Sequence, residues 1–387
     1  MNYSTIHEFS APTKLVFGQG AIERVPSLLQ QANVSFPLVV TDQGIREAGL
    51  LRILELVFEG ADISHTVFDE TEPNPSAETV KSCTQQYREG GCDCIIGLGG
   101  GSAMDVAKGT GVMVNNSREI LSYEGMDQFK NPPPYLLCIP TNYGTGSEVT
   151  PFAVITDTKR RFKVTIGGEA LFPNTAILDP NLSVRLPIPV AAATGMDALT
   201  HAIEAFVCLA GNPITRSLAI QAVGLISNNL RQAALSNQNI EATGNMLIAA
   251  TLAGRSFGFT RLGTVHAMAH PLGAHFDVPH GVANAVLLPH VMKFNLPACP
   301  AKYAEIARAL GESDCLTDNL DMGSRAIDLV ISLSQDLCIP KNLKILGVRR
   351  EGFQSMAIDA MKSGNIPVNP RETSHQDIYQ LFEQAFF

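Results

Sequence analysis

The feature that most constrains the fold of this 387-residue chain is a change of pattern near residue 185. Before that point, short runs rich in β-branched residues alternate with amphipathic stretches of helical period, such as 77–91 and 103–114. This alternation predicts a parallel sheet wrapped by helices, which is a Rossmann-like α/β domain. The predicted strands cover 14–17, 37–42, 65–69, 94–100 and 135–141, and segments 161–166 and 175–180 close the region.

After Pro187 and Pro189 the pattern becomes helical. From Ala191 onward the chain has long stretches rich in Ala, Leu and Ile and almost no strand pattern. The length is sufficient for two hydrophobic cores. We therefore predict an α/β N-terminal domain over residues 1–185 and an all-α C-terminal domain over residues 186–387.

The composition excludes several classes of protein. A hydrophobic content of 45% and a charged content of 17% are typical of a globular chain and not of a disordered one. The formal net charge is −9 and no basic run is longer than Lys159–Arg161, which argues against nucleic-acid binding. No apolar run has membrane-spanning length, and the first residues lack a secretory pattern. With eight scattered cysteines, the simplest expectation is a reduced, cytoplasmic protein without a membrane partner.

A glycine-rich turn joins the predicted strand 94–100 to the helix that follows it. Glycines at such a turn let the backbone approach a diphosphate, and the helix N-terminus supplies free N–H groups. The spacing is close to the dinucleotide fingerprint but not identical to it, so a tight turn without a ligand is the alternative. The turn contains Gly97, Gly99, Gly100, Gly101 and Ser102.

Two further polar groups follow predicted strands of the same domain. The loop 140–148 offers the hydroxyl groups of Thr141, Thr145 and Ser147, which suit contacts to phosphate or ribose. Asp42 ends an earlier strand and could accept hydrogen bonds from ribose hydroxyls, which favours NAD over NADP. Its alternative role is to cap the following helix.

The second half of the chain has a pattern of metal-ligating residues. Asp197 and His201 are four residues apart, as are His266 and His270, and His280 follows. A pair at this spacing lies on one face of a helix, so both members can point to the same site. A carboxylate with imidazoles is a ligand set for iron(II) or zinc. Five candidates exceed the usual four ligands, and a catalytic site leaves a position open, so some of these histidines must have another role.

Together these segments resemble the iron-containing (group III) alcohol dehydrogenases over nearly the whole chain. The resemblance rests on GGGSAMDVAK at 99–108, the PTxxGTGSE loop, GxDALTHAIEAF and HAMAHPLGAHFDVPHG. It implies an NAD(H)- and iron(II)-dependent enzyme that interconverts a short-chain alcohol and aldehyde, usually as a homodimer. The ligand types also permit zinc or manganese.

The resemblance assigns roles residue by residue. It implies that the metal ligands are Asp197, His201, His266 and His280. It implies cofactor contacts from Asp42, Gly99, Gly100, Gly101, Ser102, Asp105, Thr141, Thr145 and Lys163. It places Phe257 and Leu262 at the substrate cavity and makes His270 a nearby proton relay. The alternative for His270 is a structural role, in which the ring bonds to a backbone carbonyl near the site.

Arg261 departs from the relatives that reduce neutral diols, which usually have a small residue at this position. It is four residues after Phe257 and adjacent to Leu262. A guanidinium there could hold a carboxylate, phosphonate or sulfonate in bidentate fashion. We therefore count Arg261 as a substrate residue and hypothesise a short aldehyde with an anionic tail. The alternatives are an ordinary ion pair or an exposed arginine, with a neutral alcohol or diol as substrate.

Two other classes of function are remote alternatives. The dehydroquinate synthase-like lyases also combine NAD with a metal, but their additional phosphate-binding lysines and arginines are not obvious here. A non-catalytic metal and nucleotide sensor would require the open coordination position to be blocked. The absorbance of the reduced nicotinamide distinguishes these classes. An alcohol dehydrogenase changes it by turning over simple alcohols, whereas a sensor only binds the nucleotide and the metal.

Overall fold

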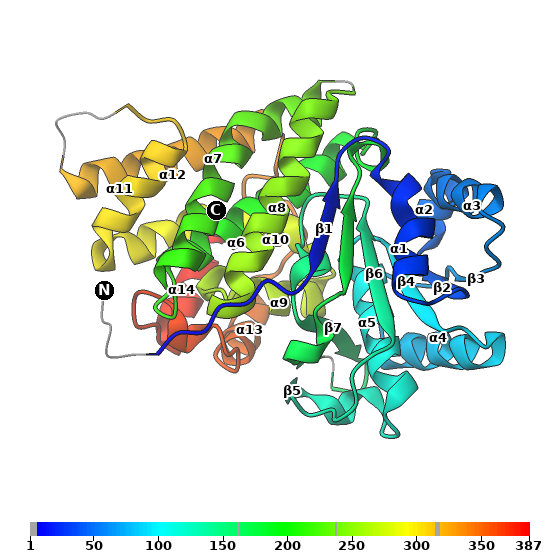
Figure 1. The fold of residues 1–387 in the computed structure, drawn as a ribbon. Helices are drawn as coiled ribbons and strands as arrows, with labels where there is room; N and C mark the ends of the chain where they lie inside the picture. Colours follow the sequence, from blue (N-terminus) through cyan, green and yellow to red (C-terminus); the bar gives the residue numbers. More distant parts are fainter. Residues whose placement is uncertain (1–5, 161, 237, 314–317) are drawn as a thin grey trace. The chain divides into compact units, whose positions relative to one another are not determined.

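The computed structural model describes residues 6–160, 162–236, 238–313 and 318–387 (Figure 1). The chain divides into two compact units, Pro12–Arg185 and Leu186–Phe387, and the described residues before Pro12 belong with the second unit. This membership differs from the predicted domains, which placed those first residues in the α/β domain. In the second unit the ring of Phe9 packs against that of Phe259, with the ring centroids 4.9 Å apart.

The unit Pro12–Arg185 is built on a six-stranded sheet in which every strand pair is parallel. The strand order is β1-β9-β6-β4-β2-β3, so the chain crosses over repeatedly through helices. The prediction of a parallel, Rossmann-like sheet is confirmed. The strands are β1 (Lys14–Phe17), β2 (Pro37–Val40), β3 (Thr66–Phe68), β4 (Cys94–Gly99), β6 (Tyr135–Pro140) and β9 (Thr175–Leu178).

Helices cover both faces of this sheet because successive strand residues point to opposite sides. In β2, Leu38 and Val40 pack into the core that contains residues of α4 and α5, whereas Val39 packs into the core that contains α1 and α3. All three side chains are fully buried. The helices of this unit are α1 (Val25–Gln31), α2 (Gln43–Glu47), α3 (Leu50–Gly60), α4 (Ala77–Gly90) and α5 (Gly101–Asn115).

A second, three-stranded sheet in this unit contains an antiparallel pair. Strand β7 (Phe152–Asp157) pairs antiparallel with β8 (Phe162–Gly167), and β5 (Gly125–Met126) pairs parallel with β8. Of these strands the sequence predicted only the segment of β8. The residues of β7 alternate between buried and partly buried positions, which is the period of a strand with one covered face.

The unit that begins at Leu186 is helical in all of its described regular elements apart from short 3₁₀ turns, which confirms the predicted all-α region (Figure 1). Local caps define several helix starts. The side chain of Asn212 accepts from Thr215 N, and Ser374 forms a capping box with Asp377. The helices are α6 (Ile188–Val207), α7 (Pro213–Leu235), α8 (Ile240–Thr260), α9 (Thr264–Phe276), α10 (His280–Asn295), α11 (Pro300–Ala309), α12 (Asn319–Asp336), α13 (Phe353–Ala360) and α14 (His375–Phe386).

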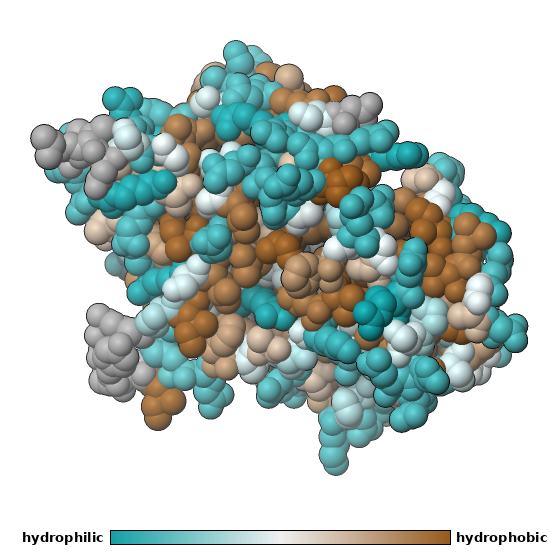
Figure 2. Space-filling model, turned by 45° about the horizontal axis from the view of Figure 1, so that its top comes forward, coloured by the Kyte–Doolittle hydropathy of each residue, from teal (hydrophilic) through white to brown (hydrophobic). Residues whose placement is uncertain are grey.

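Hydrophilic residues cover much of the face drawn in Figure 2, and apolar residues lie between them. A mixed surface is normal, because polar atoms are too few to cover a globular protein. Within the described ranges, no helix combines the length and the apolar character that crossing a bilayer requires.

Candidate functional site

A buried group of four side chains lies in the helical unit. Helix α6 carries Asp197 and His201 one turn apart, α9 carries His266, and α10 begins with His280. One ligand atom from each residue lies within 4.8 Å of those of the other three. The Asp197 Oδ1 atom is 4.0 Å from His201 Nε2, 3.8 Å from His266 Nε2 and 3.7 Å from His280 Nε2.

The spacing and chemistry of this group fit a divalent metal. Ligands at the usual bond lengths around a tetrahedral ion are about 3.4 Å apart, so the separations of 3.7–4.0 Å from Asp197 need only a small contraction. The donor set of one carboxylate and three imidazoles suits iron(II) or zinc. Asp197, His201 and His266 are buried, whereas the side chain of His280 is 30% exposed. Of the four candidate ligands, His280 is therefore the one with the most solvent exposure.

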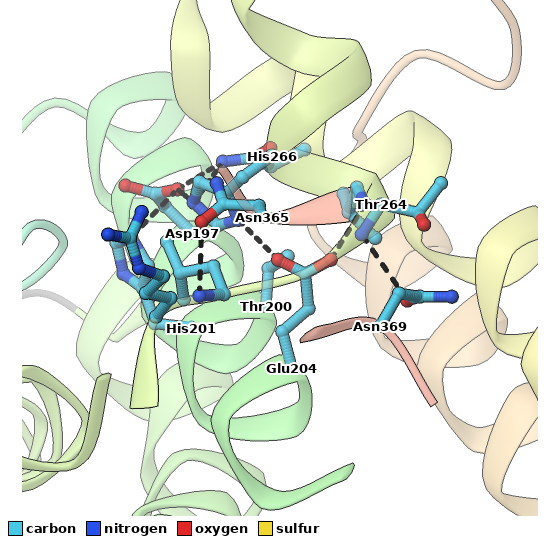
Figure 3. Close-up of polar contacts among 12 residues, drawn as sticks. Asp197, Thr200, His201, Glu204, Thr264, His266, Asn365 and Asn369 are labelled. Atoms are coloured by element: carbon cyan, nitrogen blue, oxygen red, sulfur yellow. Dashed lines mark hydrogen bonds and ion pairs between the residues drawn. The ribbon is translucent and has the colours of Figure 1, made fainter. Parts of the chain in front are cut away.

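Glu204 holds His266 from the side opposite the ligand group. Its Oε2 lies 2.6 Å from His266 Nδ1, and its Oε1 accepts a hydrogen bond from the backbone N–H of Val265 at 2.7 Å. Figure 3 shows the Glu204 carboxylate next to the His266 ring and the backbone of the first turn of α9. Burial raises the pKa of Glu204 to about 7, and the backbone hydrogen bond from Val265 opposes that rise.

His266 is a neutral imidazole in this environment. Burial, followed by the adjacent ring of His201, holds the pKa of His266 well below its ordinary value. A neutral ring with a lone pair on Nε2 is the form that binds a metal. The rings of His201 and His266 stack with centroids 4.6 Å apart, and Phe257 stacks on the other face of His201 at the same separation.

Asn284 is a member of this site that the sequence analysis missed. Its Nδ2 donates to Asp197 Oδ1 at 2.6 Å and lies 3.1 Å from His266 Nε2 and 3.2 Å from His280 Nε2. Its Oδ1 is buried and accepts no hydrogen bond within the described part of the chain. The signal that could have identified Asn284 is its position on α10, four residues after His280.

Two other histidines lie near the group or outside it. The His270 ring is 5.5 Å from that of His280 and 6.4 Å from that of His266, but His270 is not part of the ligand group. His275 instead pairs with Asp359, with 2.9 Å between Nε2 and Oδ2. The structure therefore distinguishes four candidate ligands from one adjacent imidazole and one imidazole with a separate partner.

Arg261 lies at the end of α8 in an unusual backbone conformation. Its φ of 66° and ψ of −169° fall in a region that only glycine readily adopts. The side chain is exposed, and it has no carboxylate partner among the described residues. Its Nη1 covers Gly364, where an added Cβ would lie 2.4 Å away. The neighbouring Leu262 is partly buried, and its backbone N–H faces Asn365 Oδ1 at 3.4 Å.

The glycine turn lies in the other unit, at the carboxyl end of β4. Gly99 has a φ of 150°, and Gly100 precedes α5 without a side-chain hydrogen bond that caps the helix. The glycines also permit close contacts. An added Cβ would lie 2.9 Å from Ala103 Cβ at Gly99, 2.8 Å from Asn142 Nδ2 at Gly100 and 2.9 Å from Thr145 Cγ2 at Gly101. The turn is therefore tight, and a larger residue at any of these three positions would contact a neighbouring side chain.

The other predicted polar residues of this unit surround the turn. Asp42 follows β2 and caps α2, accepting from Ile45 N at 2.9 Å, so its alternative role as a cap is observed. Thr141 donates its backbone N–H to Gly99 O at 3.0 Å, and Thr145 Oγ1 accepts from Ser147 N at 3.2 Å. Ser102 is partly buried in the first turn of α5.

Asp105 and the buried Lys108 connect α5 to the second loop. Asp105 accepts from Ser147 Oγ at 3.0 Å and from Val154 N at 3.1 Å. The Lys108 Nζ donates to Ser147 O at 2.6 Å, to Ser147 Oγ at 2.8 Å and to Phe152 O at 2.7 Å. These three acceptors satisfy an ammonium group. Lys108 ends the motif at 99–108, and the sequence alone indicated no role for it.

Burial affects both ionisable groups in this connection. It raises the pKa of Asp105 to about 6, while the charges of Lys108 and Lys163 act in the opposite direction. It lowers the pKa of Lys108, and the charge of Asp105 opposes that shift. Lys163, which extends from β8, is therefore close enough to influence Asp105.

A parallel sheet with a glycine turn is typical of nucleotide-binding proteins, and a buried carboxylate–imidazole group is typical of metal-dependent enzymes. Comparison with known proteins specifies the family. Residues 12–180 match the family described as iron-containing alcohol dehydrogenase, and residues 191–386 match the C-terminal part of the Fe-containing alcohol dehydrogenase family. The chain belongs to the iron-containing alcohol dehydrogenases. It is an NAD-dependent oxidoreductase of this family, whose cofactors are NAD(H) and iron.

Individual relatives extend over almost the whole chain. A 1,3-propanediol dehydrogenase of Citrobacter freundii is 42% identical over 382 residues, which cover 98% of each chain. The crystal structure of a 1,3-propanediol oxidoreductase has a TM-score of 0.96 at 40% identity, covering 99% of this chain and 100% of that one. A sulfoacetaldehyde reductase of Bifidobacterium kashiwanohense, in complex with NAD⁺, has a TM-score of 0.89 at 28% identity, covering 98% and 99%.

Proposed function

We propose that this enzyme interconverts a short-chain alcohol and its aldehyde, and that its metal ligands are Asp197, His201, His266 and His280. The observation that carries the proposal is the convergence of these four side chains, with ligand atoms within 4.8 Å of one another, in a largely buried site. A bound iron(II) would supply Lewis acidity, which lowers the pKa of an alcohol or polarises an aldehyde carbonyl.

The remaining residues of the site bind substrate and move its proton. Phe257 offers an apolar ring that stacks on His201, so it suits the hydrocarbon part of a small substrate. The imidazole of His270 accepts the proton of the alcohol during oxidation and returns it during reduction, because it lies beside the ligand group without belonging to it. Leu262, two residues after the last residue of α8, completes the proposed substrate contacts.

For the cofactor we propose that the glycine turn binds the diphosphate of NAD(H). The N-terminus of α5 lacks a side-chain cap, so its first N–H groups suit phosphate oxygens. Asp42 Oδ2 would accept from ribose hydroxyls while Oδ1 caps α2, so its two roles are compatible. The proposed contacts are Asp42, Gly99, Gly100, Gly101, Ser102, Asp105, Thr141, Thr145 and Lys163.

Metal reconstitution tests this function directly. The protein, freed of metal with a chelator, is loaded anaerobically with iron(II), and NADH oxidation is followed with short aldehydes. We expect turnover that requires the metal and is lost in Asp197→Ala. Nucleotide binding without turnover of any short aldehyde or alcohol would favour the sensor and contradict the proposal.

His270→Gln tests the proton relay separately. We expect kcat to fall by roughly a hundredfold or more, with a changed pH profile and unchanged metal content. A normal pH profile together with normal kcat would instead support a structural role for the ring.

A second proposal concerns the substrate's tail. The guanidinium of Arg261 is exposed and has no carboxylate partner within the described residues, which supports binding of a carboxylate, phosphonate or sulfonate. A relative whose name states sulfoacetaldehyde reduction shares the fold, whereas the more similar relatives are named for a neutral diol. The enzyme's preference between anionic and neutral aldehydes of equal length therefore decides whether its substrate has an anionic tail or is a neutral alcohol or diol.

Paired variants make this second test specific. Arg261→Met removes the charge, and Arg261→Lys retains it; both have the same unfavourable backbone conformation as the wild type. We expect Arg261→Met to raise KM for anionic aldehydes alone. Arg261→Lys should retain part of the preference for anionic over neutral aldehydes. An unchanged ratio of KM values in Arg261→Met would mean that the arginine is only an exposed side chain.

A further inference from the structure

Glu204 is a buried carboxylate that contacts a candidate ligand without being one. It lies on α6 one turn after His201 and is 3% exposed. Its two oxygens have different partners: Oε2 lies 2.6 Å from His266 Nδ1, and Oε1 accepts from Val265 N at 2.7 Å. Neither oxygen belongs to the group of ligand atoms. Glu204 therefore joins the helix that carries Asp197 and His201 to the helix that carries His266.

The contact with His266 determines which ring nitrogen bears the proton. The amide nitrogen of Asn284, which only donates, lies 3.1 Å from His266 Nε2, so the ring hydrogen is on Nδ1, where Glu204 Oε2 accepts it at 2.6 Å. The lone pair of the neutral ring is then on Nε2, the atom that lies 3.8 Å from Asp197 Oδ1. The opposite tautomer would place a hydrogen on Nε2, where it would occupy the direction of the metal.

The contact with Val265 fixes the position of the same ring. Helix α9 begins after Gly263 without a cap from its own preceding side chain. Glu204 supplies a cap from another helix, and Asn369 Oδ1 faces the N–H of Thr264 at 3.4 Å (Figure 3). At Gly263 an added Cβ would lie only 2.8 Å from Glu204 Oε1, so glycine permits the approach. The carboxylate thus holds the first turn of α9, on which His266 lies.

We infer that Glu204 is a positioning residue of the metal centre, which sets both the tautomer and the orientation of the His266 ring. This inference rests on the proposed ligand set. Partners of this kind commonly change metal affinity by roughly tenfold to a hundredfold when they are removed. The competing explanation is that Glu204 only caps α9 and stabilises the fold.

Glu204→Gln separates these two explanations because glutamine has nearly the same shape. Its carbonyl oxygen can accept from Val265 N, but its amide nitrogen then donates to His266 Nδ1 and forces the proton onto Nε2. The reversed amide restores the bond to His266 but brings two donors together at Val265. A glutamine therefore cannot serve both partners, whereas the carboxylate does.

The measurement is the affinity of the full-length, metal-free protein for Co²⁺, from its visible absorption and from competition with a chromophoric chelator. We expect Glu204→Gln to bind Co²⁺ roughly tenfold to a hundredfold more weakly and with an altered spectrum. Asn369→Ala is the matched control, because it removes the other contact at the start of α9 without touching His266. It should lower the melting temperature and leave Co²⁺ affinity unchanged.

Glu204→Asp covers the case in which the glutamine variant folds poorly. The shorter carboxylate still only accepts, so its Co²⁺ affinity should exceed that of Glu204→Gln when circular dichroism shows equal folding. Wild-type affinity in Glu204→Gln, or equal weakening in all three variants, would overturn the inference and leave only the capping role. Failure of the wild-type protein to bind Co²⁺ would instead overturn the ligand set proposed above.

Discussion

The α/β unit and the helical unit each contain a buried carboxylate, but they balance its charge differently. Asp105 accepts from Ser147 and Val154 and lies close to the ammonium of Lys108, so it has a cationic partner within the protein. Glu204 accepts from a backbone N–H and contacts a neutral imidazole. The helical unit also buries Asp197, whose neighbours are histidines and Asn284.

This difference indicates what each region requires. In the α/β connection, the charges of Lys108 and Asp105 offset part of the cost of burying the two groups. The helical group places Asp197 and Glu204 among buried histidine rings, and an uncompensated buried charge is costly. A divalent cation in the proposed ligand set would supply the missing charge, whereas the buried carboxylate of the α/β unit already has a lysine nearby.

The largest expected effect follows from removing a ligand of the metal. Asp197→Ala should abolish metal retention, measured by elemental analysis after dialysis, and lower kcat by roughly a thousandfold or more. NADH binding, followed by fluorescence, should persist, because the glycine turn lies in the other unit. Full metal content in this variant would exclude Asp197 as a ligand.

Lys108→Met tests the self-contained charge balance of the α/β unit. It leaves Asp105 without its nearby cation and several buried acceptors without their donor, so the free energy of unfolding should fall by about 3–5 kcal/mol. Lys81→Met is the control, since that side chain is 66% exposed, and urea denaturation should detect almost no change. Equal loss in both variants would mean that the burial of Lys108 is unimportant.

Gly281→Ala tests how rigidly the helical unit holds its ligands. An added Cβ would lie 2.4 Å from the backbone oxygen of Ala193, so α10 must move away from α6 and carry His280 with it. We expect a loss of about 1–3 kcal/mol and weaker Co²⁺ binding.

Gly101→Ala provides the corresponding change at the glycine turn. Its Cβ would meet a methyl group of Thr145, which is the end of a side chain and can rotate. Thermal melts should show a smaller loss of stability than in Gly281→Ala. The opposite order would contradict the view that the ligand helices are the more rigidly packed region.

The smallest expected effect is the pH dependence that Asp105 contributes. Burial raises its pKa to about 6, above the value in an unfolded chain, so the folded state binds this proton more tightly. Its contribution to stability is therefore present at low pH and is lost as the pH rises through about 6. Between about pH 5 and pH 7 the loss should be about 1 kcal/mol. Urea denaturation of Asp105→Asn should lack this slope, and an identical slope would assign it to another group.

Much of the fold was predictable because its signals are local. Residues 37–40 and 94–99 are short apolar runs next to turns, and they form adjacent parallel strands. Strand β7 was missed although residues 152–157 alternate, and its role depends on pairing with β8. Residues 6–11 precede the first strand, and only their packing against the helical unit, as in the contact of Phe9 with Phe259, shows where they belong.

The candidate ligands were visible in the sequence by themselves, because a spacing of four places Asp197 and His201, and likewise His266 and His270, on one face of a helix. Which imidazoles converge, and which residue supports them, was decided only by tertiary structure. Glu204 has no spacing that links it to His266, since 62 residues separate them in the chain. Helix packing determines such contacts, and a pattern of local period contains no information about which helices meet.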